Sequence, residues 1–93
     1  MQDKNINIAR KKIDRIDSKI LNLIKNRAAI VKFILKRKKF KKEIVDKKRI
    51  KIILKKIKSK SLKNKIDPKI TQNIWKSMIK SFIEYEQRNF KKK

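Results

Sequence analysis

The chain has 93 residues, with no glycine, one proline, no cysteine and no histidine. This length suits one small domain, and the shortage of turn residues favours long helices over sheet hairpins. The absence of cysteine and histidine excludes disulfides, thiolate nucleophiles, zinc sites built on these ligands and histidine acid–base catalysis.

The formal net charge of +24 is typical of a nucleic-acid-binding protein. However, 26 of the 32 basic residues are Lys, and Ile, Lys and Asn are abundant together. Because these three residues share AT-rich codons, a bias in base composition also explains the excess. Lys is spread all round the predicted helices, not gathered on one face. We therefore interpret most of it as solvated surface, and keep a basic helical nucleic-acid-binding protein as an alternative.

No apolar run approaches the roughly 18 residues that a membrane span requires. The first eight residues, Met1 to Ile8, lack the apolar stretch of a signal peptide. The sequence therefore predicts a cytoplasmic protein with no membrane partner.

The first predicted helix runs from about residue 6 to about residue 38. Such a helix would be about 50 Å long, more than the roughly 25–30 Å diameter of a compact monomer of this size. We expect it to project and to pack against a second copy, in an intertwined homodimer. The helical spacing on which this rests is that of Ile13, Ile16, Ile20, Leu23, Ile24, Val31, Ile34 and Leu35.

Residues 39–45 read as a break in the helical pattern. Asp46 is suited to an N-cap or a first-turn acid, and apolar spacing then predicts a second helix over about 46–60. The polar, Lys-rich stretch from Ser59 to Lys65 predicts a fraying end and a loop.

Asp67 and Pro68 give a strong helix start, with Asp as the N-cap and Pro at the first helical position. The third predicted helix covers about 68–90. The sequence thus predicts a single all-α domain over residues 1–93, with one long, one short and one medium helix.

Several charged residues fall on apolar helix faces. At 100° per residue, Arg27 lies at the centre of the first helix's apolar stripe, Lys38 shares that face, and Arg10 lies near its edge. Arg49 lies on the apolar side of the second helix, and Glu86 on that of the third.

A buried charge without a partner is costly, so these residues require an explanation. One is internal pairing of Glu86 with Lys38 or Arg27 as a structural contact. The other is a cavity that binds a charged ligand. Four cations against one acid favour an anionic ligand, and cavities between bundle helices are ordinary ligand sites. Without a nucleophile, carboxylate pair, phosphate loop or metal cluster, the expected chemistry is electrostatic, needing no cofactor and no metal.

Three segments resemble the three helices of the all-helical (AroQ-type) chorismate mutases. They are ARKKIDRIDSKILNLIKNRAAIVKFILKRK at residues 9–38, IVDKKR at 44–49 and IDPKITQNIWKSMIKSFIEYEQ at 66–87. The resemblance implies an intertwined homodimer with two active sites. It also implies the Claisen rearrangement of chorismate, a dicarboxylate, to prephenate in aromatic amino acid biosynthesis.

The resemblance also implies roles for the cations. Arg10 would reach into the partner subunit's site and bind a carboxylate, and Arg27 would bind the other carboxylate of chorismate. Lys38 would contact a carboxylate and the ether oxygen, while Arg49 would support the carboxylate region.

Of the remaining positions, Asp46 would lie near the substrate hydroxyl, and Glu86 would hydrogen-bond the ether oxygen. Two positions depart from the family. Ile50 replaces a Glu that binds the hydroxyl, and Phe82 replaces a Ser one turn before Glu86. The apolar replacement resembles the related isochorismate pyruvate lyases, a second candidate activity. We predict Lys38, Glu86 and Arg27 as the catalytic residues, and as the substrate-binding set Arg10, Arg27, Lys38, Asp46, Arg49, Ile50, Phe82 and Glu86.

Overall fold

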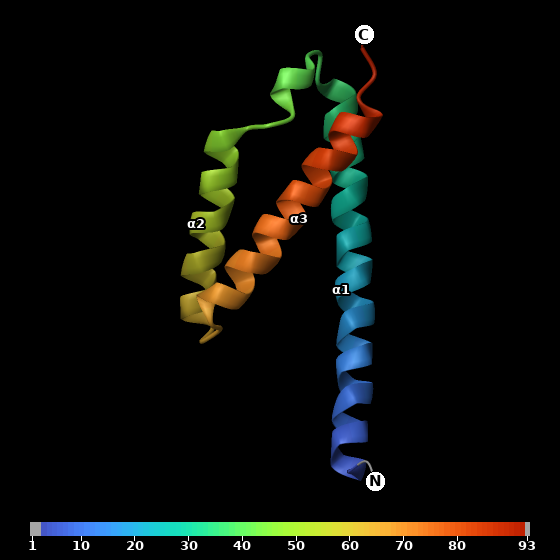
Figure 1. Cartoon of the computed structure of the whole chain (residues 1–93), viewed down its shortest axis with the longest axis vertical. Coiled ribbons are helices and arrows are strands. Elements are labelled where there is room, and N and C mark those ends of the chain that lie inside the picture. The colour runs from blue at the N-terminus through green and yellow to red at the C-terminus, as the bar shows by residue number, and fades with distance from the viewer. Residues whose placement is uncertain (1–2, 93) are drawn as a thin grey trace. The chain divides into compact units, whose positions relative to one another are not determined.

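The computed structural model describes residues 3–92 of the chain, and these residues form helices and loops with no strand. The elements, in order, are α1 (Lys4–Arg37), the 3-10 helix η1 (Lys41–Glu43), α2 (Lys47–Lys63) and α3 (Pro68–Asn89), as Figure 1 shows. The predicted all-α class with three α-helices is confirmed. None of the helices in the described part of the chain is long and apolar enough to cross a membrane.

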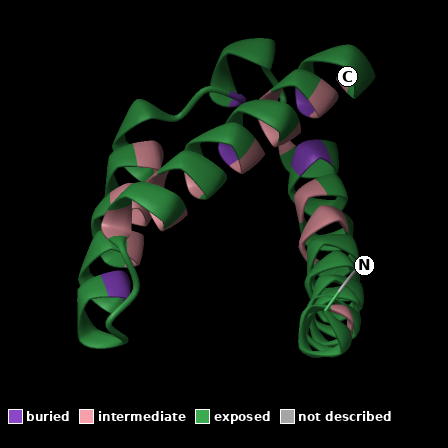
Figure 2. Cartoon of the chain, turned by 60° about the horizontal axis from the view of Figure 1, so that its bottom comes forward, coloured by how far each residue is buried: buried purple, intermediate pink, exposed green. Residues whose placement is uncertain are grey.

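The chain divides into two compact units, Met1–Val31 and Lys32–Lys93. The described part of the first unit is a single stretch of α1, which has no second element of its own to cover its apolar stripe. Ile13 and Ile16 are accordingly each 54% exposed, and Figure 2 shows this stretch as almost wholly exposed. A helix stripe of this kind is stable only against another apolar surface. The homodimer predicted from the sequence stays a prediction.

The second unit contains the last turns of α1, then η1, α2 and α3. α1 ends at Arg37, where the Lys38 amide donates to the Leu35 carbonyl at 3.2 Å. The connection that follows contains η1, which the sequence did not predict. A 3-10 helix of three residues is too short to show a periodic pattern of apolar residues in the sequence, so only its hydrogen bonds identify it.

The N-cap of α2 is Asp46, whose Oδ1 accepts a hydrogen bond from the Arg49 amide at 3.0 Å. The N-cap of α3 is Asp67, whose Oδ1 accepts from the Lys69 amide at 2.9 Å, with Pro68 at the first helical position. Both starts follow the sequence prediction. An N-cap carboxylate satisfies an amide that has no partner within the helix.

The end of α2 differs from the prediction, because the helix continues to Lys63 while residues 59–65 read as a loop. The reason is Ser61, which is 3% exposed. Its Oγ donates to the Ile57 carbonyl at 2.6 Å and lies 2.6 Å from Thr71 Oγ1 on α3. Ser61 is therefore a polar residue within the contact between α2 and α3.

The turn after α2 reverses the chain without a glycine. Lys65 has φ 56°, and the amides of Lys65 and Ile66 donate to the carbonyls of Leu62 and Ser61. This bond pattern is the Schellman motif, in which glycine is the usual left-handed residue. The reversal brings α3 back along α2, where Gln72 Nε2 donates to the Leu54 carbonyl at 2.8 Å.

The buried side chains are few among the described residues. They are Leu35 at the end of α1, Ile44 after η1, Ser61 on α2, and Ile79 and Glu86 on α3. So small a core is what a short chain is expected to have before association.

We predict that the Ser61–Thr71 contact couples α2 to α3. Ser61→Ala and Thr71→Val should each lower the free energy of unfolding by about 1 kcal/mol, the usual net value of one hydrogen bond. The double variant should lose less than the sum, since each single change already breaks the shared bond. Thermal unfolding at one fixed protein concentration measures this. Ser59→Ala, an exposed position on the same helix, is the control. Additive losses would contradict the coupling.

Candidate active site

The described structure brings Lys38 and Glu86 together, although 48 positions separate them. Lys38 Nζ lies 3.3 Å from Glu86 Oε1 and 3.5 Å from Oε2, so the two side chains form an ion pair. Glu86 is 6% exposed, while the Lys38 side chain is 19% exposed. The sequence left Lys38 and Arg27 open as partners of Glu86, and the structure pairs Glu86 with Lys38.

Buried apolar residues lie on the same segments as both partners. Leu35 lies three positions before Lys38 and Ile44 six positions after it, and both are buried. Ile79 lies seven positions before Glu86, two turns along the same face of α3. Glu86 itself has little contact with water, and this strengthens the attraction of its carboxylate to the ammonium group.

The other predicted residues of the second unit lie on α2 and α3. Asp46 and Arg49, at the start of α2, are exposed, and the Asp46 carboxylate caps the helix. Arg49 was expected on an apolar side, but the first turn of α2 leaves it exposed. Ile50 and Phe82 are half-buried, Phe82 one turn before Glu86 on α3.

Ile50 lines a groove between α2 and α3. The groove has a volume of about 400 Å³. Its apolar side consists of Ile50, Leu54, Ile79 and Ile83, and it is also lined by the polar residues Lys76, Lys80, Glu84 and Gln87. Ile50, which replaces the family's Glu, therefore lies on the apolar side of this groove.

Arg10 and Arg27 both lie on α1 within the first unit. Arg10 is exposed and Arg27 is half-buried. Their membership of the site stays a prediction.

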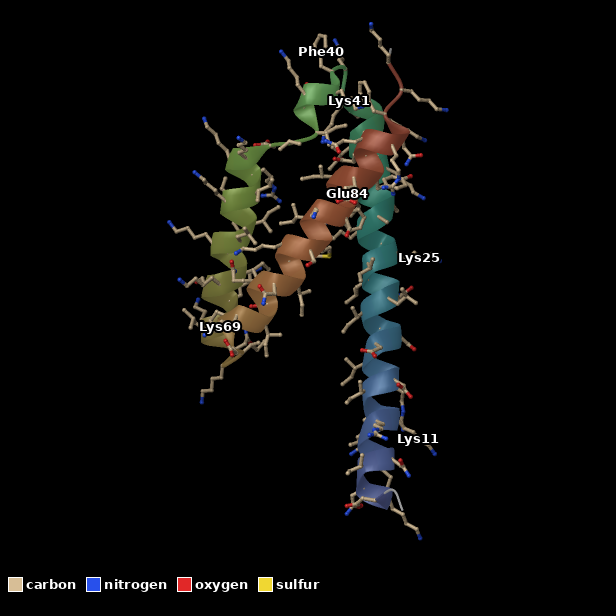
Figure 3. The ribbon with its side chains drawn as sticks, viewed as in Figure 1. Lys11, Lys25, Phe40, Lys41, Lys69 and Glu84 are labelled. Carbon is tan, nitrogen blue, oxygen red and sulfur yellow. The ribbon has the colours of Figure 1, made fainter. Side chains whose placement is uncertain are left out.

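Glu43 is a residue that the sequence reasoning missed. Its Oε2 accepts hydrogen bonds from the amides of Lys39 and Phe40, at 2.8 and 2.9 Å, directly after Lys38. The bond from the Phe40 amide is the main cause that lowers the pKa of Glu43, and the charges of Lys38 and Lys39 add to it. The only available signal was an acid within a Lys-rich break. Figure 3 shows Phe40 and Lys41 in this connection.

An ammonium group beside a carboxyl group can bind one oxygen atom from two sides. Lys38 Nζ donates as a cation, and Glu86 donates when it carries a proton. Such a pair stabilises negative charge that develops on an oxygen during a reaction. No cluster of three or more His, Cys, Asp or Glu that could hold a metal ion occurs in residues 3–92.

The family model of chorismate mutase type II matches residues 9–87. The chain belongs to this family. Comparisons with curated proteins and with solved structures found no match. As a member of the chorismate mutase family, the chain is an enzyme that isomerises chorismate to prephenate. The matched segment contains every site residue predicted from the sequence, from Arg10 to Glu86.

We predict that removing one partner of the Lys38–Glu86 pair costs more than replacing both. Lys38→Met should lower the free energy of unfolding by about 1–3 kcal/mol, because it leaves a buried carboxylate without its cation. The double variant Lys38→Met/Glu86→Leu should regain most of this loss. Urea unfolding at a fixed protein concentration measures both, with Lys36→Met at an exposed position as the control. A double variant less stable than Lys38→Met would contradict this expectation.

Proposed function

We propose that the chain catalyses the Claisen rearrangement of chorismate to prephenate by electrostatic stabilisation of the transition state, centred on Lys38 and Glu86. The observation that supports this is the buried pair itself, with Nζ and Oε1 3.3 Å apart. We further propose that the reaction serves aromatic amino acid biosynthesis in the cytoplasm.

The rearrangement breaks the ether C–O bond of chorismate while a new C–C bond forms within the same molecule. Negative charge builds on the ether oxygen as its bond to carbon lengthens. A donor that binds this oxygen more strongly in the transition state than in the substrate accelerates the step. Lys38 supplies one such donor and protonated Glu86 the other.

The pair also defines a proton requirement. In the structure Lys38 and Glu86 are in contact as an ion pair. An ether oxygen that binds between them offers lone pairs but no proton. Glu86 can donate a hydrogen bond to that oxygen only as an acid, so the proposed mechanism requires Glu86 in its protonated form.

Arginines are suited to the two carboxylates of the substrate, because a guanidinium group binds a carboxylate through two parallel hydrogen bonds. In our proposal Arg27 binds one carboxylate and Arg10 of a second subunit binds the other. Arg49 supports the carboxylate region, and Asp46 lies near the hydroxyl. Holding the flexible substrate in its reactive shape supplies the remainder of the rate enhancement.

The proposed assembly is a homodimer in which α1 packs against a second copy. The exposed stripe supports this, with Ile13 at 54% and Ile20 at 48% exposure. The shortage of buried side chains supports it too, because short chains commonly complete their cores by association.

Isochorismate pyruvate lyase activity is the second candidate. The apolar groove around Ile50 favours it, since Ile50 lies beside Leu54 and Ile79 where a hydroxyl-binding carboxylate was expected. Ile50 itself offers a substrate hydroxyl no hydrogen-bond partner, and a buried hydroxyl left unpaired is costly. A substrate with its hydroxyl elsewhere on the ring avoids that cost.

One assay distinguishes the two activities. The purified protein is incubated with chorismate and, in parallel, with isochorismate, and the products are identified. We expect prephenate from chorismate, with a higher kcat/KM than that for pyruvate release from isochorismate. The Ile50→Glu variant is the matched comparison, and should improve kcat/KM for chorismate if the hydroxyl lies against this side of the groove. Pyruvate release as the dominant activity would replace the first proposal by the second.

We also predict a pH dependence that belongs to Glu86. We expect kcat/KM of the parent to fall as pH rises, because an ionised Glu86 has no proton to donate to the ether oxygen. Glu86→Gln donates without titrating, so its profile should lack this alkaline limb. Asp17→Asn, an exposed carboxylate on α1, should keep the parent profile. An identical alkaline limb in the parent and in Glu86→Gln would rule out this role.

A further inference from the structure

We propose that Glu43 is a positioning residue for Lys38. Its carboxylate fixes the two residues after Lys38, and thereby keeps the Lys38 ammonium group at Glu86. This inference rests on the role of Lys38 in the proposed function.

The hydrogen bonds around Lys38 leave its backbone little freedom. On one side, the Lys38 amide donates to the Leu35 carbonyl at 3.2 Å, which continues the last turn of α1. On the other side, the amides of Lys39 and Phe40 both donate to Glu43 Oε2, at 2.8 and 2.9 Å. Lys38 therefore lies between a helix end and a carboxylate that binds two successive amides.

Glu43 is itself held in place. Its amide donates to the Phe40 carbonyl at 3.0 Å, and the next residue, Ile44, is 4% exposed. The Ile44 amide donates to the Lys41 carbonyl at 3.1 Å. A buried isoleucine thus fixes Glu43, and Glu43 fixes the segment that carries Lys38.

The connection depends on such contacts because the residues next to Lys38 lie outside the helices. Residues 38–40 have no regular secondary structure, and Lys39 and Phe40 are exposed. A chain of this kind samples many conformations unless hydrogen bonds restrict it. The ammonium group of Lys lies at the end of a flexible four-carbon stem. If the backbone of Lys38 also became disordered, the ammonium group would reach still more positions.

A test has to separate two properties of Glu43: the length of its side chain, called its reach here, and its negative charge. Both amides bind the same atom, Oε2, and an amide carbonyl oxygen of Gln also has two lone pairs to accept them. Asp keeps the charge beside Lys38 and Lys39 but is one methylene shorter. Gln therefore keeps the reach without the charge, and Asp keeps the charge without the reach.

The experiment measures kcat and KM for chorismate in Glu43→Gln, Glu43→Asp and Glu43→Ala. We expect kcat to fall about tenfold in the Ala and Asp variants, as expected for loss of one to two hydrogen bonds, with KM changed less than about threefold. Glu43→Gln should stay within about threefold of the parent. Asp17→Ala removes an exposed carboxylate from α1 and is the control.

Amide hydrogen exchange gives a second readout that does not depend on activity. The amides of Lys39 and Phe40 should be protected in the parent and in Glu43→Gln, and should exchange faster in Glu43→Asp. Circular dichroism and the unfolding midpoint establish that each variant is folded. The Gln and Asp pair keeps the test decisive even where the Ala variant unfolds.

The outcomes separate this inference from the proposed function. If Lys38→Met retains parent activity, the proposed function is wrong for Lys38. If Lys38→Met is inactive while Glu43→Asp and Glu43→Ala have the parent kcat, only the positioning role is wrong. Parent activity in Glu43→Asp together with a large loss in Glu43→Gln would assign the effect to charge, and would also overturn it.

Discussion

The ion pair between Lys38 and Glu86 is the contact on which the site depends, because it joins the end of α1 to the last turns of α3. Glu86 is the buried carboxylate among the described residues, and a buried carboxylate is tolerated only when a cation or hydrogen bonds satisfy it. In the proposed mechanism, this contact also brings together the two groups that act on the substrate. The proposal therefore assigns a role in stability and a role in catalysis to the same two side chains.

Acidic residues are scarce in this chain, and several have identifiable structural tasks. There are eight against 32 basic residues. Asp46 and Asp67 cap α2 and α3, Glu43 binds two amides after α1, and Glu86 pairs with Lys38. Carboxylates are most stabilising where free amides or a partly buried cation face them. On a Lys-rich background, the position of an acid is thus a better guide to structure than the position of a base.

The sequence predicted the features that depend on neighbouring residues. The starts of α2 and α3 follow from Asp46 and Asp67, whose side chains act within three positions. The end of α2 depends on Thr71, ten positions beyond Ser61, and no local pattern reveals that contact. Helical periodicity placed Lys38 and Glu86 on inner faces, but it gives directions and no distances, so it left Arg27 open as an alternative partner. The role of Glu43 depends on two backbone amides, which a sequence pattern does not display.

Stability and catalysis are linked if α1 pairs with a second copy as proposed. The stripe on α1 contains large apolar side chains with about half of their surface exposed, among them Ile13, Ile16 and Ile20. Arg10 is one turn from Ile13 on the same helix, so a contact that buries this stripe also fixes the position of Arg10. Burial of the stripe would then supply the association energy, and delivery of Arg10 would supply a carboxylate-binding group. In the proposed dimer, each site takes Arg10 from one subunit and its other cations from the partner. Such a site is complete only in the assembled form, so dissociation would remove activity even where the helices stay folded.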